Sequence, residues 1–246
     1  MQSYENIYCE KMTIPSYMVD GKLGITPTFL LNIMQEVAVN HVGAIGCGWN
    51  FLQQRGQFWA LSRMDVLIER RPRWREQVII NTWGKKHNFL VQPRDFLVET
   101  EDGEPLVRAT SNWVILDFNG KPCELSSIEP LLKNQPNFHS IEKPATRLRQ
   151  FVELGNTVFH PVEYSRIDMN CHANNGSYVH WVMDSFDYAF HQTHELKSIS
   201  LNYLQQTKPT DRYAVAKKEI EAGLFLCSIY SETAKIEVCR VLTQWT

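Results

Sequence analysis

The sequence predicts an α+β fold made of two successive units, each a long helix wrapped by an antiparallel sheet. The chain has 246 residues, of which 43% are hydrophobic. That length suits one large domain or two domains of about 120 residues, each with a core of its own. Two segments carry apolar residues at helical spacing, and each is followed by several runs rich in aromatic and β-branched residues. This repeated order of helix and strands indicates the fold class.

The first predicted helix runs from Thr26 to about Ile45. Thr26 is a good N-cap, Pro27 suits the first helical position, and the glycines of Gly43–Gly48 end the helix. Its apolar face carries Leu30, Ile33, Met34, Val37, His41, Val42 and Ile45. Predicted strands follow at Phe58–Ile68, Val78–Trp83, Phe89–Thr100 and Leu106–Asp117. Turns are expected at 101–104 and at Asn119-Gly120.

The second predicted helix begins after Asn174 or Asn175, either of which can cap it. Its apolar stripe is Val179, Val182, Met183, Phe186 and Phe190. Predicted strands follow at Ser198–Gln206, Tyr213–Glu221, Leu224–Glu232 and Ala234–Leu242, with a tight turn at Ala222-Gly223.

The two units share a spacing as well as a layout. Asp20 lies six residues before the cap Thr26, and Asp168 lies six residues before Asn174. Two copies of a helix laid on an antiparallel sheet fit a tandem, or double, hotdog. We expect an N-terminal domain over 1–135, a linker over 136–149 and a C-terminal domain over 150–246.

Composition excludes several classes of function. A net charge of −2 argues against a nucleic-acid or anionic-membrane binder. No apolar run approaches the length of about 18 residues that a spanning helix needs, so we expect no membrane insertion. The N-terminal residues lack the pattern of a signal peptide, which predicts a cytoplasmic protein. The six cysteines are scattered without a CxxC pair, which predicts neither disulfides nor a metal site.

The segment before the second helix is the best candidate for chemistry. Asp168, Asn170 and His172 occupy alternate positions, so in an extended segment their side chains project to one side. A base, an amide donor and the positive end of a helix are what an acyl-transfer site needs to stabilise an oxyanion. The alternative is a polar capping loop whose Asx residues make turns.

The first unit serves as an internal control. At the positions of Asp168 to His172 it has Asp20, Gly21, Lys22, Leu23 and Gly24, so lysine replaces the amide and glycine the histidine. A polar set needed only for capping would be expected in both copies. The difference favours one catalytic half and one half with another purpose, such as holding a substrate tail.

Several segments, in order along nearly the whole chain, resemble the acyl-acyl-carrier-protein (acyl-ACP) thioesterase family of plants and bacteria. They are Gln35–His41, Trp59–Met64, Arg71–Trp74 with Asn81–Trp83, Arg108–Val114 and Asp168–Asn175. The resemblance implies a tandem hotdog whose N-terminal half shapes the acyl pocket and whose C-terminal half carries catalysis. It also implies hydrolysis of the thioester between a fatty acyl chain and carrier-protein phosphopantetheine, without metal or cofactor. The expected partner is therefore acyl carrier protein.

One departure from the family affects the mechanism. Plant members carry a glutamate followed by a cysteine after the second helix, and the matching residues here are Gln206 and Thr207. A cysteine nucleophile is excluded at that position, and Gln206 can orient a water but cannot take a proton. The expected base is then Asp168 or His172, with Asn170 and helix N–H groups stabilising the oxyanion. Direct attack by Asp168 is the alternative.

Other candidate residues are weaker. Cys171 lies inside the loop, but alternation predicts that it faces away from its neighbours. His191 and His194 have metal-ligand spacing without a third ligand nearby. His41 is interpreted as a core histidine. The cluster Arg70, Arg71, Arg73 and Arg75 could dock an acidic carrier protein, or pair with Glu69 and Glu76 in a solvated turn.

Two other functions remain open: acyl-CoA hydrolysis, or a non-catalytic hotdog module that binds acyl groups. The glutamine at position 206 is the feature that favours a binding module. A hydroxyacyl dehydratase is disfavoured by Asn170. The chain could be a monomer or a homodimer.

Overall fold

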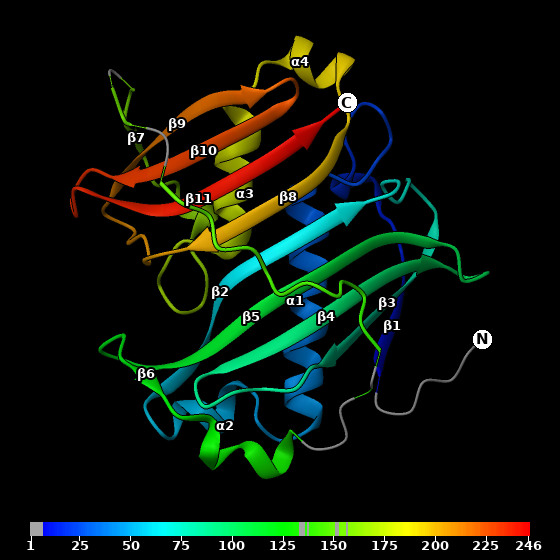
Figure 1. Ribbon diagram of the computed structural model, residues 1–246, viewed down its shortest axis with the longest axis vertical. Helices are drawn as coiled ribbons and strands as arrows, with labels where there is room; N and C mark the ends of the chain where they lie inside the picture. The colour runs from blue at the N-terminus through cyan, green and yellow to red at the C-terminus, as the bar shows by residue number, and fades with distance from the viewer. Residues whose placement is uncertain (1–6, 133–135, 137, 151–152, 156) are drawn as a thin grey trace. The chain divides into compact units, whose positions relative to one another are not determined.

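The computed structural model of the chain describes residues 7–132, 136, 138–150, 153–155 and 157–246. The chain forms two compact units, Met1–Ala145 and Thr146–Thr246, and this division lies within the segment 136–149. Each unit contains an antiparallel sheet with a helix against it (Figure 1).

The sheet of the first unit has the strand order β1-β3-β4-β5-β2, with the short β6 paired to β5. The strands are β1 (Tyr8–Thr13), β2 (Gln57–Ile68), β3 (Gln77–Gly84), β4 (Val91–Thr100), β5 (Pro105–Asp117) and β6 (Pro122–Cys123). Strands β2 to β5 confirm the predicted runs, whereas β1 was not predicted. It pairs with β3 from Tyr8 opposite Thr82 to Thr13 opposite Gln77.

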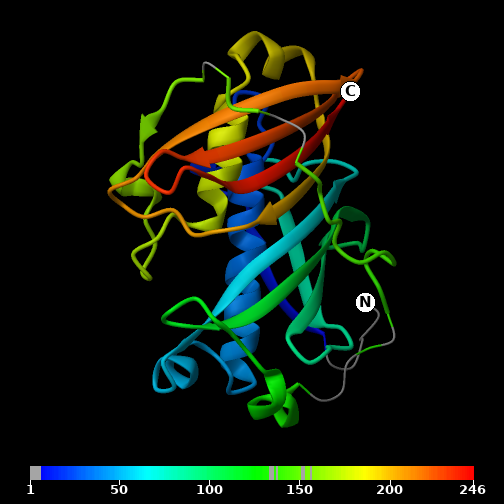
Figure 2. The ribbon, with the colours of Figure 1, turned by 60° about the vertical axis from the view of Figure 1, so that its left-hand side comes forward.

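The long helix α1 (Pro27–Ala44) confirms the first predicted helix. The Thr26 side chain caps it by accepting a hydrogen bond from the backbone N–H of Phe29 at 3.4 Å. Figures 1 and 2 show α1 crossing one face of the unit's sheet. The apolar stripe is accordingly buried at Leu30, Ile33, Met34 and Val37, and half-buried nearer the end of the helix. The helix ends where Gly46 adopts a φ of +83°, and the short α2 (Trp49–Gln53) follows.

The second unit repeats this arrangement. Its strand order is β8-β11-β10-β9-β7, and α3 (Asn175–Asp184) lies on one face of the sheet (Figure 1). The strands are β7 (His160–Pro161), β8 (Leu196–Tyr203), β9 (Arg212–Glu221), β10 (Leu224–Ser231) and β11 (Ile236–Trp245). Short 3₁₀ turns occur at η1 (Ser16–Met18), η2 (Leu125–Ser127), η3 (Glu129–Leu131) and η4 (Tyr164–Arg166).

Two predictions for this unit were wrong in detail. The apolar stripe that extends to Phe190 belongs to two helices, α3 and α4 (Tyr188–Thr193), because Asp187 accepts from the N–H of Phe190 at 2.7 Å and starts a new helix. The strand predicted to reach Gln206 ends at Tyr203. There the N–H groups of Leu204 and Gln205 both donate to the carbonyl of Val238, at 2.9 and 3.2 Å, which ends the regular ladder.

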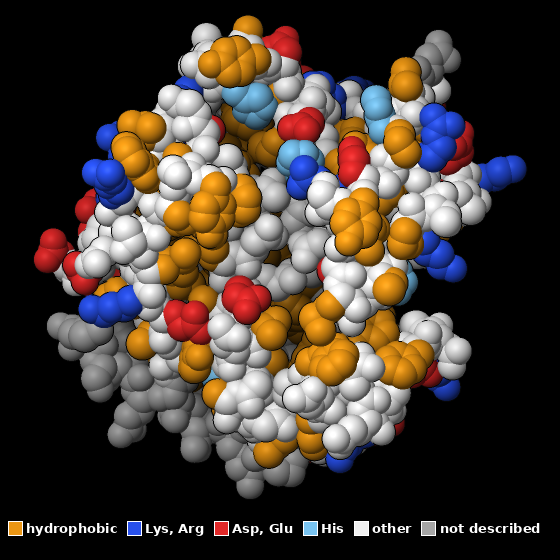
Figure 3. Space-filling view, turned by 180° about the vertical axis from the view of Figure 1, so that it is seen from behind, with side chains coloured by type: hydrophobic (Ala, Val, Ile, Leu, Met, Phe, Trp, Pro, Cys, Tyr) orange, Lys and Arg blue, Asp and Glu red, His pale blue; other side chains and the backbone are white. Residues whose placement is uncertain are grey.

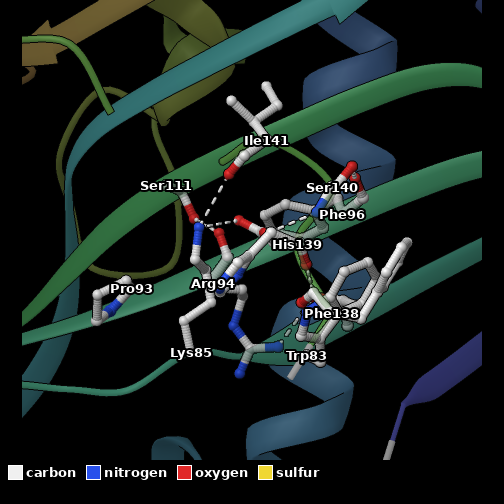
Figure 4. A network of polar contacts seen from close by, with 12 residues as sticks. Trp83, Lys85, Pro93, Arg94, Phe96, Ser111, Phe138, His139, Ser140 and Ile141 are labelled. Atoms are coloured by element: carbon white, nitrogen blue, oxygen red, sulfur yellow. Dashed lines mark hydrogen bonds and ion pairs between the residues drawn. The ribbon is translucent and has the colours of Figure 1, made fainter. Parts of the chain in front are cut away.

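Residues 138–141, within the segment expected to be a linker, are bound to the sheet of the first unit (Figure 4). The Asp95 carboxylate, fully buried, pairs with Lys85 at 3.2 Å and accepts from the N–H of Ser140 at 2.8 Å. Lys85 also donates to the Ile141 carbonyl at 3.0 Å. Trp83 donates to the Phe138 carbonyl at 2.9 Å, so the start of the segment is fixed by specific contacts.

The surface mixes charges of both signs. On the face seen in Figure 3, Lys and Arg side chains are scattered among Asp, Glu and apolar side chains. Among the described residues, we find no helix whose length and hydrophobicity would let it span a bilayer.

Candidate active site

The loop that carries Asp168, Asn170 and His172 is a tight turn before α3. The N–H of Asp168 donates to the His172 carbonyl at 2.8 Å, and the N–H of Cys171 donates to the Asp168 carbonyl at 3.0 Å. A bridge between Ile167 and Ala173 closes the turn, in which Cys171 takes a φ of +60°. The expected extended conformation is therefore wrong for this segment, and its side chains cannot be placed by strand alternation.

The Asp168 carboxylate organises this turn. Its Oδ1 accepts from the backbone N–H of Asn170 at 2.8 Å and from that of His172 at 3.3 Å. This is an Asx turn, as the alternative interpretation of the loop anticipated. The carboxylate thereby holds the backbone that presents Asn170 and His172.

Asn170 and His172 contribute backbone N–H groups to the turn, whereas their side chains make no hydrogen bond within it. Asn170 is exposed and His172 is half-buried. The Nδ1 atom of His172 is buried and has no hydrogen-bond partner among the described residues. Because buried polar atoms are almost always paired, this nitrogen is a place where a water or a substrate group can bind.

The first unit contains the same turn. Asp20 Oδ1 accepts from the N–H groups of Lys22 at 3.0 Å and Gly24 at 3.4 Å, and Leu23 has a φ of +61° where Cys171 has +60°. The aspartate therefore serves the turn in both units. The polar side chains that distinguish the second unit are Asn170 and His172, where the first unit has Lys22 and Gly24.

In the first unit, Gly24 stands at the position that matches His172, and an arginine side chain lies against it. Asp20 Oδ2 pairs with Arg71 Nη1 at 2.5 Å. A Cβ added to Gly24 would lie 2.9 Å from the guanidinium carbon of Arg71, so glycine makes room for the arginine. Asp168 has no such cation among its described partners, which are backbone amides.

The segment at Gln206 lies directly against the catalytic candidates. The carbonyl of Thr207 accepts from the N–H of Ala173, the residue after His172, at 2.9 Å. Thr207 is fully buried, and its N–H and hydroxyl are both bonded to the Tyr178 hydroxyl, at 3.1 and 3.0 Å. Burial raises the pKa of Tyr178, which therefore stays a neutral phenol. Gln206 itself is exposed.

The start of α3 is occupied by its own cap. The Asn174 side chain accepts from the N–H of Gly176 at 2.8 Å, and its carbonyl accepts from the N–H of Ser177 at 2.8 Å. These N–H groups are engaged within the helix start. What α3 offers an oxyanion is its dipole, whereas the exposed amide of Asn170 can offer a direct hydrogen bond.

The other sequence candidates lie outside this loop. Arg70 makes a two-pronged pair with Glu76 at 2.7 and 2.9 Å, which raises the pKa of the arginine and lowers that of the glutamate. Arg71 is bound to Asp20, whereas Arg73 and Arg75 are exposed, the latter over the Trp74 ring. Docking of a carrier protein on this cluster stays a prediction.

The histidines and Cys171 occupy separate environments. His191 contacts the Met183 carbonyl at 2.9 Å, and His194 stacks on Phe190 at 4.0 Å. Cys171 is exposed. Among the residues that the structure describes, no three His, Cys, Asp or Glu side chains are grouped so as to hold a metal ion.

Comparison with known proteins identifies the family of this fold and loop. The family model described as acyl-ACP thioesterase N-terminal domain matches residues 5–128, and the C-terminal domain model matches 153–246. An oleoyl-acyl carrier protein thioesterase of Arabidopsis thaliana is 28% identical over 83% of this chain and 60% of its own length. A palmitoyl-acyl carrier protein thioesterase of Gossypium hirsutum is 28% identical over 97% of this chain and 63% of its own. The chain thus spans less than two thirds of these relatives.

Solved structures show the same fold over both units. An acyl-ACP thioesterase from Bacteroides thetaiotaomicron superimposes with a TM-score of 0.85 at 24% identity, covering 98% of each chain. The 12:0-ACP thioesterase from Umbellularia californica gives 0.86 at 21% identity, over 100% of this chain and 99% of that one. These likenesses confirm the α+β hotdog fold. With family models matching most of its length, the chain belongs to the acyl-ACP thioesterase family.

Proposed function

We propose that the protein hydrolyses the thioester of a fatty acyl-ACP, releasing a free fatty acid and the carrier protein and so ending chain elongation. The observation that carries this proposal is the loop before α3. It has the same turn as the first unit but adds Asn170 and a His172 whose Nδ1 is buried without a partner. Family membership and the printed activities of the relatives support the same reaction.

In the proposed mechanism His172 is the base that activates a water. Asp168 Oδ1 already accepts two backbone hydrogen bonds, so its part is to hold the turn and favour the imidazolium that forms. The activated water attacks the thioester carbonyl, the C–S bond breaks, and the thiolate of phosphopantetheine leaves. Direct attack or proton transfer by Asp168 is the competing path.

Asn170 and the α3 dipole would stabilise the oxyanion. The exposed amide of Asn170 is a donor that no described residue uses. Removal of one such donor reduces the rate by about 10²–10³. Gln206 precedes Thr207, whose carbonyl accepts from the N–H of Ala173, and in this mechanism its amide would orient the water.

Thr207, the residue that matches the plant cysteine, has a structural role. Thr207 is fully buried, and its hydroxyl is bonded to Tyr178. A nucleophile there would have to break this contact and reach substrate from the core, so we assign Thr207 no chemical step.

The test is hydrolysis of acyl thioesters over a series of chain lengths, on carrier protein and on coenzyme A. We expect turnover that prefers the carrier protein and falls at least about a hundredfold in His172→Ala and Asn170→Ala. His160→Ala, at an exposed site outside the loop, is the control and should keep its rate. Preference for coenzyme A would instead indicate an acyl-CoA thioesterase.

A second candidate function is a non-catalytic acyl-binding module, which Gln206 favours because an amide cannot accept a proton. Stoichiometric acyl binding without turnover in the wild type would support it. Turnover gained by Gln206→Glu in that case would show that the missing carboxylate is the cause.

A further inference from the structure

Arg166 connects the site loop, residues 168–172, to α3 through both its backbone and its side chain. Its carbonyl accepts from the N–H of Asn174 at 2.8 Å and from the Ser177 hydroxyl at 3.0 Å. Its Nη2 lies 2.8 Å from Nε2 of His180, which is on α3. Its Nε is buried and has no hydrogen-bond partner among the described residues, so the bond to His180 is what holds the guanidinium. Since Arg166 lies two residues before Asp168, these contacts fix the start of the site loop against the helix.

The first unit has the backbone part of this connection without the side-chain part. The carbonyl of Met18, two residues before Asp20, accepts from the N–H of Thr26 at 2.9 Å. By the same spacing Asn32 matches His180, but a methionine side chain has no hydrogen to donate to it. The side-chain bond is therefore not needed to form the turn, and it accompanies the polar residues of the second unit.

Nε2 of His180 faces two partners with opposite requirements. An arginine side chain only donates hydrogen bonds, so Arg166 requires a lone pair on this nitrogen. The Asp184 carboxylate, whose Oδ2 lies 3.1 Å from the same atom, only accepts and requires a hydrogen there. Because the nitrogen carries either a lone pair or a hydrogen, it can bond to only one of the two at a time.

The surroundings of His180 decide which form is present. Burial lowers its pKa below the ordinary 6.5; Asp184 opposes this shift, Arg166 adds to it and Glu163 opposes it. The Glu163 carboxylate itself accepts from the Tyr213 hydroxyl at 3.4 Å. At pH 7 the ring is therefore neutral and accepts from Arg166, whereas a ring that has gained a proton donates to Asp184.

We propose that Arg166 and His180 are positioning residues for the site loop, which they hold against α3 while the His180 ring is neutral. A proton gained by His180 moves the Nε2 hydrogen bond from Arg166 to Asp184 and frees the arginine side chain. A displacement of about 1 Å in reacting groups can lower a rate by about a hundredfold, so a loop that presents a base and an amide donor needs to be held. The effect on turnover rests on the proposed thioester hydrolysis, whereas the exchange of hydrogen bonds does not.

Fluorine NMR of a label on Cys171, an exposed residue of the site loop, tests the exchange. Bromotrifluoroacetone attaches the label in a chain with Cys9→Ser and Cys123→Ser, so that the less buried thiols elsewhere do not react. The same chain carries His172→Gln, so that the neighbouring imidazole does not titrate. As the pH falls from 8 to 4.5, we expect the signal of this reference chain to move with a midpoint below pH 6.5.

Variants in this reference chain assign the movement. His180→Gln should keep the signal at its pH 8 position, because an amide oxygen accepts from Arg166 at every pH. Arg166→Met should give the low-pH position already at pH 8. Asp184→Asn should move the midpoint to lower pH, because the carboxylate raises the pKa of His180. His160→Gln, at an exposed histidine of the same unit, is the matched control and should leave the midpoint unchanged.

A signal that stays fixed in the reference chain, or that moves equally in His180→Gln, would overturn the proposal. Asp184→Asn keeps the test open if Arg166→Met does not fold, because 68% of the Asp184 side chain is exposed and its replacement should cost little stability. An unchanged midpoint in Asp184→Asn would also overturn the proposal.

Steady-state kinetics of the unlabelled chain, with His172 intact, measure the effect on turnover. Arg166→Met should lower kcat about tenfold at pH 8 with KM unchanged, as for the loss of one hydrogen bond from a charged group. His180→Gln should keep a larger share of its pH 8 rate at pH 5.5 than the wild type does. A folded Arg166→Met variant with the wild-type kcat would contradict the positioning role. A wild type without turnover would contradict the proposed hydrolysis and leave the NMR result standing.

Discussion

Asp20 and Asp168 show how one residue type in one local conformation can serve two purposes. Both accept the same pair of backbone N–H groups and close the same turn. The two carboxylates differ in their other contacts: Oδ2 of Asp20 binds Arg71, whereas the described contacts of the Asp168 carboxylate are with the backbone N–H groups of Asn170 and His172. Conservation of the turn between the units is thus structural, and its surroundings decide whether it can take part in chemistry.

Asparagine substitution separates these two purposes. Asp20→Asn removes the ion pair with a largely buried Arg71 and should lower the free energy of unfolding by about 1–3 kcal/mol, with turnover per folded molecule retained. Asp168→Asn should change stability by less than about 1 kcal/mol and reduce turnover at least about a hundredfold. Urea unfolding and steady-state kinetics measure both. Equal loss of activity in the two variants would contradict the division of roles.

His41 should make stability depend on pH. Its pKa is about 4 in the folded protein and about 6.5 when unfolded, because burial and Arg94 disfavour its charged form. Below pH 6.5 the unfolded chain binds a proton that the folded chain does not, so stability falls as pH drops from 6.5 to 4. The loss is at most about 3 kcal/mol.

Urea unfolding at pH 7 and 4.5 checks this effect. His41→Gln should flatten the dependence, and the exposed His160→Gln should leave it as in the wild type. If the free energy of unfolding of His41→Gln depends on pH as strongly as that of the wild type, His41 is not the cause of the dependence.

At the scale of elements, most helices and strands followed from periodicity and caps. Thr26 and Asn174 cap the two long helices as predicted. The break between α3 and α4 was missed because apolar spacing continues to Phe190 across it, although the Asp187 cap was a visible signal. β1 was missed because its residues, Tyr8–Thr13, do not alternate between apolar and polar types.

The sequence predicted which residues form the candidate site, but the predicted conformation of the loop was wrong. Asp168, Asn170 and His172 share one loop, but the positive φ of Cys171 turns the backbone. Gln206 was predicted to lie on a strand, but β8 ends at Tyr203. The next residue, Thr207, connects this segment to the loop by accepting a hydrogen bond from the N–H of Ala173. Arg94 was not singled out, although a charged residue within an apolar strand was a signal.

The contacts that hold residues 138–141 include one buried ion pair, between Lys85 and Asp95. Lys85→Met would leave the Asp95 carboxylate fully buried without its cation, and burial already raises the pKa of Asp95. We expect a loss of about 3–5 kcal/mol in the free energy of unfolding. Lys86→Met, at the exposed neighbour, should cost little. Urea unfolding of both variants compares them, and equal stability would argue against the anchor.

At the scale of the whole molecule, the described cysteines are all free and differ in exposure: two are exposed, Cys123 is half-buried and three are buried. Cys9 and Cys171 are exposed, whereas Cys47, Cys227 and Cys239 are buried, which raises their thiol pKa values, to about 11 for Cys47 and about 12 for Cys227. Iodoacetamide should therefore label Cys9 and Cys171 first in the native protein and the buried three only after denaturation. Mass spectrometry of timed samples measures the order, and early labelling of Cys239 would contradict the fold of the second unit.

The fold class, the two-unit layout, the starts of the long helices and the family could all be predicted from the sequence. These follow from local properties, namely residue spacing, caps and motifs in order, which need no knowledge of distant contacts. Three features could be seen only in the folded chain: Arg71 pairs with Asp20, Tyr178 holds the Thr207 hydroxyl, and the buried Arg94 donates to His41 and Thr82. Charge balance and burial are set by residues far apart in the chain, so local sequence cannot specify them.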